Sequence, residues 1–227
     1  SIAGPKSREL LQRLVDDDVS NEAFRFLDIR KLDVGMAPCL VGRVSFTGDL
    51  GYEIWMEPEF QRYVFDLIQN QGEDLGLRLF GSRALNSLRV EKNFGSWARE
   101  YRPIYGPYEA GMGRFVALKK DADFIGKAGA AAEKEHGGKL RLRVFVVAAT
   151  DADAIGGEPI RHQGEVKGWV TSGGYAHASG LSVAMGYVPK EIADEKDGWS
   201  IDILGETLSA TPQPEPIFDP KAEHMRG

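Results

Sequence analysis

The chain has 227 residues, of which 42% are hydrophobic and 27% charged, a composition typical of a soluble globular protein with one large domain or two small ones. Its formal net charge of -6 argues against a nucleic-acid-binding surface, which needs a clustered basic excess. No apolar stretch reaches the length of a membrane span, and no secretory signal pattern opens the sequence. The single cysteine, Cys39, excludes a disulfide framework and favours a reducing, cytoplasmic compartment.

The first half of the chain mixes helical and extended patterns. Apolar residues recur at helical spacing in three stretches, residues 5–15, 58–72 and 82–92. Extended runs over 40–46 and 52–56 flank Thr47-Gly48-Asp49-Leu50-Gly51, which predicts a β-hairpin with a tight turn. Shorter apolar runs predict strands at 77–80 and 115–118. Together these elements predict an α+β fold, an antiparallel sheet with helices on one face.

The second half of the chain has a different sequence pattern. Residues 94–113 have no clear period, and an irregular segment of this length is often functional. Residues 123–126 resemble the start of a helix, and Gly137-Gly138 is the predicted boundary between an α+β domain, 1–136, and a β domain, 137–227. Short strands are predicted at 140–147, 159–161, 166–171, 182–188, 200–204 and 207–210. Turn signals at Gln163-Gly164, Gly173-Gly174 and Gly205-Glu206 separate several of them, which predicts a small antiparallel β-barrel. The proline-rich segment with Pro212, Pro214, Pro216 and Pro220 is predicted to extend over the surface.

Glu53 stands out within its predicted strand. Tyr52, Ile54 and Met56 share one face of the strand, and Glu53 shares the other with Trp55. A carboxylate set among apolar residues needs hydrogen-bond donors, because an unpaired buried charge is costly. Those donors can be a structural arginine or backbone N–H groups, or the N–H groups of a ligand. For an isolated glutamate in a strand, the residues alone favour the structural interpretation.

Arg83 and Arg89 lie on the helix predicted from Ser82. Six residues of helix separate them by about 120°, so they face different sides. Arg89 is flanked by Leu88 and Val90, and spacing alone favours an arginine that pairs with an acidic neighbour while its stem covers the core. The functional alternative is recognition of a ligand carboxylate by a planar guanidinium. A stacking surface for an aromatic ring is available from Phe46, Tyr52, Trp55, Phe94, Trp97 and Tyr101, although any one of these is more often a core residue.

Several sites are excluded by their missing motifs. The chain has no G-x-G-x-x-G after a strand, no P-loop and no G-x-S-x-G elbow, which argues against a dinucleotide site, a nucleotide triphosphate site and a nucleophilic serine of these kinds. The four histidines lie far apart without ligand spacing, which argues against a metal site. Cys39, beside Pro38 and Leu40, is interpreted as a small buried hydrophobic residue.

Two segments carry a family resemblance: SFTGDLGYEI, and GSRALNSLRVEKNFGSWAREY after it. Together they resemble the tetrahydrofolate-binding aminomethyltransferase fold of the glycine cleavage T-protein and of the C-terminal half of dimethylglycine and sarcosine dehydrogenases. The likeness extends from Ala3 to about Phe218, nearly the whole chain. The WAREY and SGGYAHASGLSVAMGYVP segments are most similar to the dehydrogenase branch.

The resemblance implies roles for named residues. The glutamate of the G-Y-E-I motif, here Glu53, would hydrogen-bond the pterin edge of folate. Arg83 and Arg89 match arginines of the S-R-A-L and S-L-R motifs that are implied to bind substrate. The full set of implied folate-binding residues is Glu53, Arg83, Arg89, Phe46, Tyr52, Trp55 and Phe94. Relatives often have a tyrosine where this chain has Phe46, and E-K-G-Y where it has Asn93-Phe94, so a hydroxyl is lost at both places.

The resemblance also implies a function. It implies a module of an FAD-dependent dehydrogenase that passes a one-carbon unit from an N-methylated, glycine-type amine to tetrahydrofolate, giving 5,10-methylenetetrahydrofolate. The family's catalytic aspartate and the flavin part would both precede Ser1, so no catalytic residue is assigned here, and the chain alone is expected to be inactive and able to form homodimers. The alternatives are a non-catalytic folate-binding relative and an interaction domain of the same fold.

Overall fold

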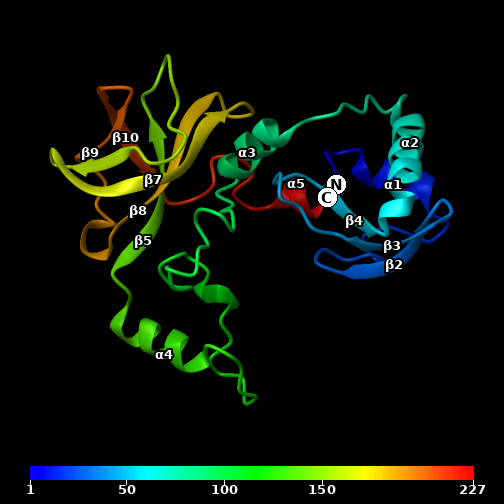
Figure 1. Ribbon diagram of the computed structural model, residues 1–227, viewed down its shortest axis with the longest axis horizontal. Helices are drawn as coiled ribbons and strands as arrows, with labels where there is room; N and C mark the ends of the chain where they lie inside the picture. Colours follow the sequence, from blue (N-terminus) through cyan, green and yellow to red (C-terminus); the bar gives the residue numbers. More distant parts are fainter. The chain divides into compact units, whose positions relative to one another are not determined.

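The computed structural model describes residues 1–227, which form two compact units. Unit 1 consists of Ser1–Lys92 together with Phe218–Gly227, and unit 2 of Asn93–Ile217 (Figure 1). These units divide after Lys92 and again before Phe218. The domain boundary predicted at Gly137-Gly138 stays a prediction. No helix is both long and apolar enough to cross a membrane.

Unit 1 is an antiparallel sheet with helices on one face, as the sequence predicts. Its strands lie in the order β1 (Ile2–Ala3), β4 (Gly51–Met56), β3 (Ala37–Gly42) and β2 (Ile29–Val34). Its helices are α1 (Ser7–Leu14), the short 3-10 turn η1 (Pro58–Phe60), α2 (Gln61–Gly72), α3 (Ser82–Glu91) and α5 (Glu223–Arg226). Helices at 5–15, 58–72 and 82–92 are therefore confirmed within a few residues at their ends.

The core of unit 1 lies between helices α1 and α2 and one face of the sheet. Leu10, Leu11 and Leu14 of α1 are buried in the same cluster as Cys39 and Tyr52 of the sheet. Cys39 is buried, and burial raises the pKa of its thiol, which confirms the interpretation of this residue as a small core hydrophobe. The helices thus cover the face that carries Tyr52 and leave the face that carries Glu53 uncovered by α1 and α2.

Two sequence predictions in unit 1 are wrong. The hairpin forms, but β3 ends at Gly42, and residues 43–50 are an irregular loop rather than a strand and a tight turn. Farther along the loop, the N–H groups of Gly48, Asp49 and Leu50 bond side-chain oxygens of the loop itself, which replaces pairing with a strand. The strand predicted at 77–80 does not form either. Leu77 packs instead beside Gly72 at the end of α2, where its N–H bonds the Gly72 carbonyl.

Unit 2 begins with a long irregular segment and ends in a barrel. The segment contains the 3-10 turn η2 (Gly113–Phe115) and leads into α4 (Lys127–His136), so the predicted helix entry is confirmed. The strand predicted at 115–118 is wrong. Phe115 is 61% exposed, and the N–H groups of Phe115 and Val116 bond carbonyls three residues earlier, which forms turns in place of a strand.

The barrel is closed by six antiparallel strands. They lie in the order β10 (Glu206–Gln213), β5 (Leu140–Val147), β8 (Leu181–Pro189), β7 (Glu165–Ala176), β6 (Pro159–His162) and β9 (Trp199–Ile203), and the 3-10 turn η3 (Lys190–Ile192) follows β8. Phe145, Ile160 and Ile201 are fully buried at its centre. The predicted turn at Gln163-Gly164 is a two-residue hairpin connection with positive φ at both residues, and Leu204-Gly205 forms a second one. The predicted small antiparallel barrel is thereby confirmed.

The proline-rich segment does not simply extend over the surface. Pro212 lies in β10 opposite Phe145 of β5, so this end of the segment is part of the barrel. The last ten residues belong to unit 1 and end in α5. The prediction of an extended surface tail is therefore wrong at both ends of the segment.

Gly173-Gly174 is not a turn but part of β7, which runs unbroken to Ala176. Gly173 is required by a close approach, because a Cβ at this position would lie 2.3 Å from the Ala154 carbonyl oxygen. This oxygen belongs to the backbone, so it cannot move aside as the end of a flexible side chain could. Gly173 therefore marks a place of close packing within unit 2.

We expect Gly173→Ala to lower the free energy of unfolding of unit 2 by about 1–3 kcal/mol, because the added methyl group overpacks the core. The matched control is Gly129→Ala, since no atom lies within 4 Å of a Cβ there and Gly129 lies inside helix α4. That change is expected to be neutral or to stabilise by up to about 1 kcal/mol. Urea unfolding measures both variants, and equal stabilities would contradict the account of Gly173.

Candidate functional site

The outer face of the unit 1 sheet carries Glu53 and Trp55 on β4. Glu53 lies opposite Gly42 on β3, and Trp55 lies opposite Leu40. A Cβ on Gly42 would come within 2.8 Å of the Trp55 ring, so the glycine gives the indole room over the strand. Glu53 is half-buried, and its carboxylate makes no hydrogen bond or ion pair within the chain. Neither a structural arginine nor a backbone N–H supplies the donors that this carboxylate needs.

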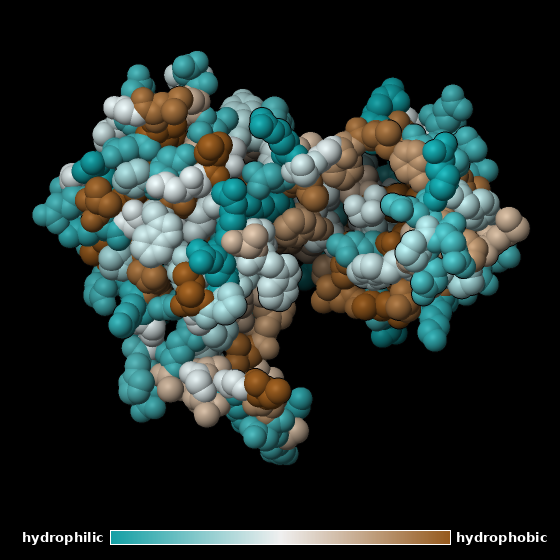
Figure 2. Space-filling view, viewed as in Figure 1, coloured by the Kyte–Doolittle hydropathy of each residue, from teal (hydrophilic) through white to brown (hydrophobic).

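The same face exposes large apolar side chains. Ile29 is 60% exposed, and Leu40 and Trp55 are each 44% exposed. Figure 2 shows hydrophobic side chains in brown along the lower edge of unit 1, on the side of the sheet away from α1 and α2. The site is thus an acceptor carboxylate beside an indole on an open, largely apolar surface, which can bind a flat heterocycle with N–H donors on one edge.

The other predicted aromatic residues lie in different surroundings. Tyr52 is fully buried on the opposite face of β4, where its ring lies 5.8 Å from that of Phe24, so it does not share a surface with Glu53. Phe46 is half-buried in the loop that leads into β4. Phe94 belongs to unit 2 and is half-buried. Trp97, also in unit 2, is 85% exposed and meets Tyr101 edge-to-face.

Arg83 and Arg89 face different sides of α3, as their spacing predicts. Arg83 is exposed in the first turn of the helix. Arg89 is 3% exposed, and its Nε and Nη2 donate to Asn86 Oδ1 at 3.1 and 2.7 Å. Arg89 is therefore held in place by a neighbour one turn earlier, whereas Arg83 is open to a ligand in solvent.

A buried ion pair between Lys92 and Asp219 lies in the same unit, and the sequence analysis missed it. Lys92 Nζ lies 2.8 Å from Asp219 Oδ2, and both side chains are 3% exposed. Burial alone would raise the pKa of the Asp219 carboxyl, but hydrogen bonds from Lys92 and from the backbone of α5 outweigh it, so the pKa is lowered. In the sequence, the pair is represented by a lysine inside E-K-N-F and an aspartate inside F-D-P, and 127 residues separate the two.

Arg43 is a further buried cation of unit 1, besides Arg89 and Lys92. It is 2% exposed, and its guanidinium donates to the carbonyls of Phe24 and Arg226. Burial lowers the pKa of Arg43, with the nearby guanidinium of Arg8 acting in the same direction. The buried charge of Arg43 therefore depends on backbone carbonyls as its hydrogen-bond acceptors.

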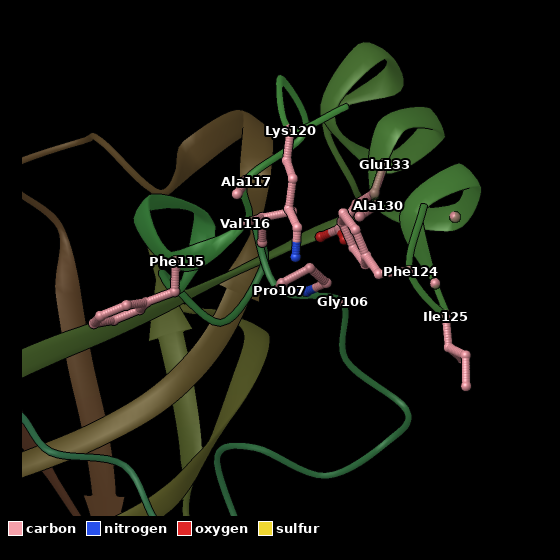
Figure 3. Close-up of a pocket in the computed structure, with 12 residues that line it drawn as sticks. Gly106, Pro107, Phe115, Val116, Ala117, Lys120, Phe124, Ile125, Ala130 and Glu133 are labelled. Atoms are coloured by element: carbon pink, nitrogen blue, oxygen red, sulfur yellow. The ribbon is translucent and has the colours of Figure 1, made fainter. Parts of the chain in front are cut away.

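Unit 2 contains a separate cavity of about 580 Å³ between the irregular segment and α4. Its walls include Pro107, Val116, Phe124 and Ala130. Figure 3 shows the Lys120 ammonium and the Glu133 carboxylate directed toward the middle of this group, whereas Phe115 and Ile125 point away. The cavity can hold a small apolar ligand beside the charged groups of Lys120 and Glu133. None of the residues predicted as folate-binding lines it.

No group of three or more histidine, cysteine, aspartate or glutamate side chains is placed to hold a metal ion. Of the four histidines, His162 is buried in the barrel, where its ring lies 4.5 Å from that of Trp199. This histidine is a core residue of β6.

Comparisons with known proteins agree on one family. The family model described as the GCVT N-terminal domain matches residues 1–120, and the one described as the glycine cleavage T-protein C-terminal barrel domain matches residues 141–219. The fold matches that of the glycine cleavage system aminomethyltransferase T from Bartonella henselae, with a TM-score of 0.80 at 21% sequence identity, over 94% of this chain and 57% of that one.

Two curated relatives show the breadth of the family. Mitochondrial dimethylglycine dehydrogenase of Homo sapiens is 38% identical over 216 residues, which cover 95% of this chain but 25% of the relative. An aminomethyltransferase of Desulfitobacterium hafniense is 30% identical over 210 residues, which cover 92% of this chain and 56% of the relative. The chain thus spans about a quarter of the dehydrogenase and about half of the aminomethyltransferase. The cytoplasmic compartment stays a prediction.

Proposed function

Since the chain belongs to the GCVT family of aminomethyltransferases and related dehydrogenases, we propose that it binds tetrahydrofolate on the outer face of unit 1 and serves one-carbon transfer. The single observation that carries the proposal is Glu53. Its carboxylate lies on an open apolar face beside Trp55 and makes no hydrogen bond or ion pair within the chain. A folate pterin would supply the N–H donors that this carboxylate needs.

The residues of this face fit the proposed ligand. Trp55 offers an indole surface for stacking, and Phe46 lies in the loop that precedes β4. Tyr52 is left out of the proposed contacts, because its ring belongs to the core. Arg83, exposed at the start of α3, is proposed to meet the glutamyl carboxylates of folate, whereas the buried Arg89 is proposed to support this helix through Asn86.

The reaction of the whole protein is likewise proposed. When bound, tetrahydrofolate would supply the N5 and N10 nitrogens that accept the one-carbon unit. The residues of this chain would bind the pterin, orient it and exclude water from one side of it, which is positioning rather than covalent catalysis. A flavin-dependent part of the protein, with FAD, is proposed to oxidise an N-methylated, glycine-type amine such as dimethylglycine or sarcosine.

We expect Glu53→Gln to weaken tetrahydrofolate binding by about 2 kcal/mol or more, because it removes a charge-assisted hydrogen bond to the pterin. The thermal unfolding temperature should change little, since the Glu53 carboxylate bonds no other group of the protein and its backbone pairing with β3 is unaffected. Titration calorimetry with tetrahydrofolate measures the affinity. Glu57→Gln is the matched control, because Glu57 is an exposed carboxylate directly after the same strand and should leave binding unchanged.

Three results would count against the proposal. The absence of measurable binding by the unaltered chain would contradict folate binding by these residues alone. An equal loss of affinity in Glu57→Gln would show that net charge, and not the Glu53 contact, decides binding. Lower stability with unchanged affinity in Glu53→Gln would show that Glu53 is structural.

A further inference from the structure

The last ten residues of the chain, 218–227, which we call the tail, lie against the loop 43–50 that joins β3 to β4. At one end of the loop, Arg43 donates a hydrogen bond to the Arg226 carbonyl. At the other end, Leu50 Cδ1 lies 3.0 Å from the position that a Cβ on Gly227 would take. The tail thus contacts both ends of the loop, although more than 170 residues of sequence separate them.

Lys92 connects the middle of the loop to the tail. Its Cβ, Cγ and Cδ atoms lie 2.8–3.0 Å from the position of a Cβ on Gly48, so the aliphatic stem packs directly on the loop backbone. Its ammonium bonds the side chain and the backbone carbonyl of Asp219 and lies 5.9 Å from the centre of the Phe218 ring. A single side chain therefore bridges the loop and the tail.

Asp219 also builds the part of the tail that reaches Arg43. Its carboxylate accepts the N–H groups of Glu223 at 2.7 Å and Met225 at 3.4 Å, which caps the start of α5. The other end of α5 presents the Arg226 carbonyl to Arg43. Without the tail, Lys92 and Arg43 would be two buried cations that lose acceptors, which is costly in an apolar interior.

We propose that the tail is a clamp on the loop, and that Lys92 and Asp219 are thereby positioning residues for the candidate folate site. The loop carries Phe46 and continues directly into β4, where Glu53 is the third residue. A loop without regular hydrogen bonding needs outside contacts to keep one conformation. The clamp itself is a property of unit 1, and only its effect on ligand affinity rests on the proposed function.

The test compares Lys92→Met, Asp219→Asn and Lys92→Arg in the full 227-residue chain. Lys92→Met keeps the stem on Gly48 and removes the ammonium, Asp219→Asn keeps the shape of the carboxyl group, and Lys92→Arg keeps the positive charge. Lys221→Met is the control, because Lys221 is an exposed lysine of the same tail. Two quantities are measured: amide hydrogen exchange in residues 43–50 and in β2, and the dissociation constant for tetrahydrofolate.

In Lys92→Met and Asp219→Asn, we expect exchange in residues 43–50 to rise by about tenfold or more, while exchange in β2 stays within about twofold. The dissociation constant should rise by about tenfold as the loop loses its single conformation. Lys92→Arg should keep most of the exchange protection and most of the tetrahydrofolate affinity of the unaltered chain. Lys221→Met should match the unaltered chain in both.

Unchanged exchange in residues 43–50 would overturn the clamp, whatever the chain binds. Exchange that rises equally in β2 would also overturn it, since Lys92 would then support the whole unit and not the loop. Faster loop exchange with an unchanged dissociation constant would overturn the positioning role and leave the proposed function standing. If the unaltered chain binds no tetrahydrofolate, the proposed function fails, and the exchange data still decide the clamp.

Discussion

Replacing Phe145 by alanine is expected to lower the free energy of unfolding of unit 2 by about 3–5 kcal/mol, because it removes a large aromatic side chain from a packed core. Phe145 is fully buried on β5, and its ring lies 5.4 Å from that of Trp199 on β9. These strands are not neighbours in the barrel, so the pair packs across its interior. Few other side chains can fill the space that the substitution leaves.

Phe115→Ala provides the control for Phe145, because it removes the same atoms from a side chain of unit 2 that is 61% exposed. We expect its effect to stay within about 0.5 kcal/mol. Urea unfolding monitored by tryptophan fluorescence measures both variants. A loss below about 1 kcal/mol for Phe145→Ala would show that the barrel core is not close-packed at this position.

Replacing Glu100 by alanine is expected to lower the free energy of unfolding of unit 2 by about 3 kcal/mol or more, because it removes a fully buried carboxylate and leaves its hydrogen-bond donors unsatisfied. Glu100 Oε2 accepts the Ser96 N–H at 2.8 Å, and Oε1 accepts the Ser172 hydroxyl. The Glu100 carbonyl accepts the Tyr187 hydroxyl at 2.7 Å, and burial raises the pKa of this tyrosine. The W-A-R-E-Y motif thus ties the irregular segment to strands β7 and β8 of the barrel.

Two further variants separate charge from packing at Glu100. Glu100→Gln keeps the shape and should cost less than Glu100→Ala. Glu135→Ala removes an exposed carboxylate from α4 of the same unit and should change stability by less than about 0.5 kcal/mol. Thermal and urea unfolding measure all three. A Glu100→Ala variant as stable as Glu135→Ala would contradict a structural role for the motif.

Local periodicity predicted most of the secondary structure. The helical spacing of Leu10, Leu11 and Leu14 predicted α1, and alternation in LRLRVFVV predicted β5, because such patterns reflect which face of an element is buried. The runs at 77–80 and 115–118 look like strands, yet neither finds a neighbouring strand to pair with. Pairing depends on distant segments, which a short apolar run does not specify.

The candidate site was only partly predictable. Alternation along β4 placed Glu53 and Trp55 on one face and Tyr52 on the other, and the structure places them so. The same alternation does not say which face the helices cover, so Tyr52 was included among residues implied to bind folate although its ring lies in the core. The spacing of Arg83 and Arg89 likewise predicted different sides of α3 but not which of them would be buried.

By itself, the sequence determined the kind of each strong element and the order in which the elements follow one another, because hydrophobic period and turn residues act over a few positions. It also determined the family, through ordered motifs that span nearly the whole chain. Only the tertiary structure decided that Gly173-Gly174 lies inside a strand and that residues 43–50 form a loop. It also decided that Asp219 neutralises Lys92 across 127 residues of sequence. These features depend on close approaches between distant segments, and no local pattern records which buried group will meet which partner.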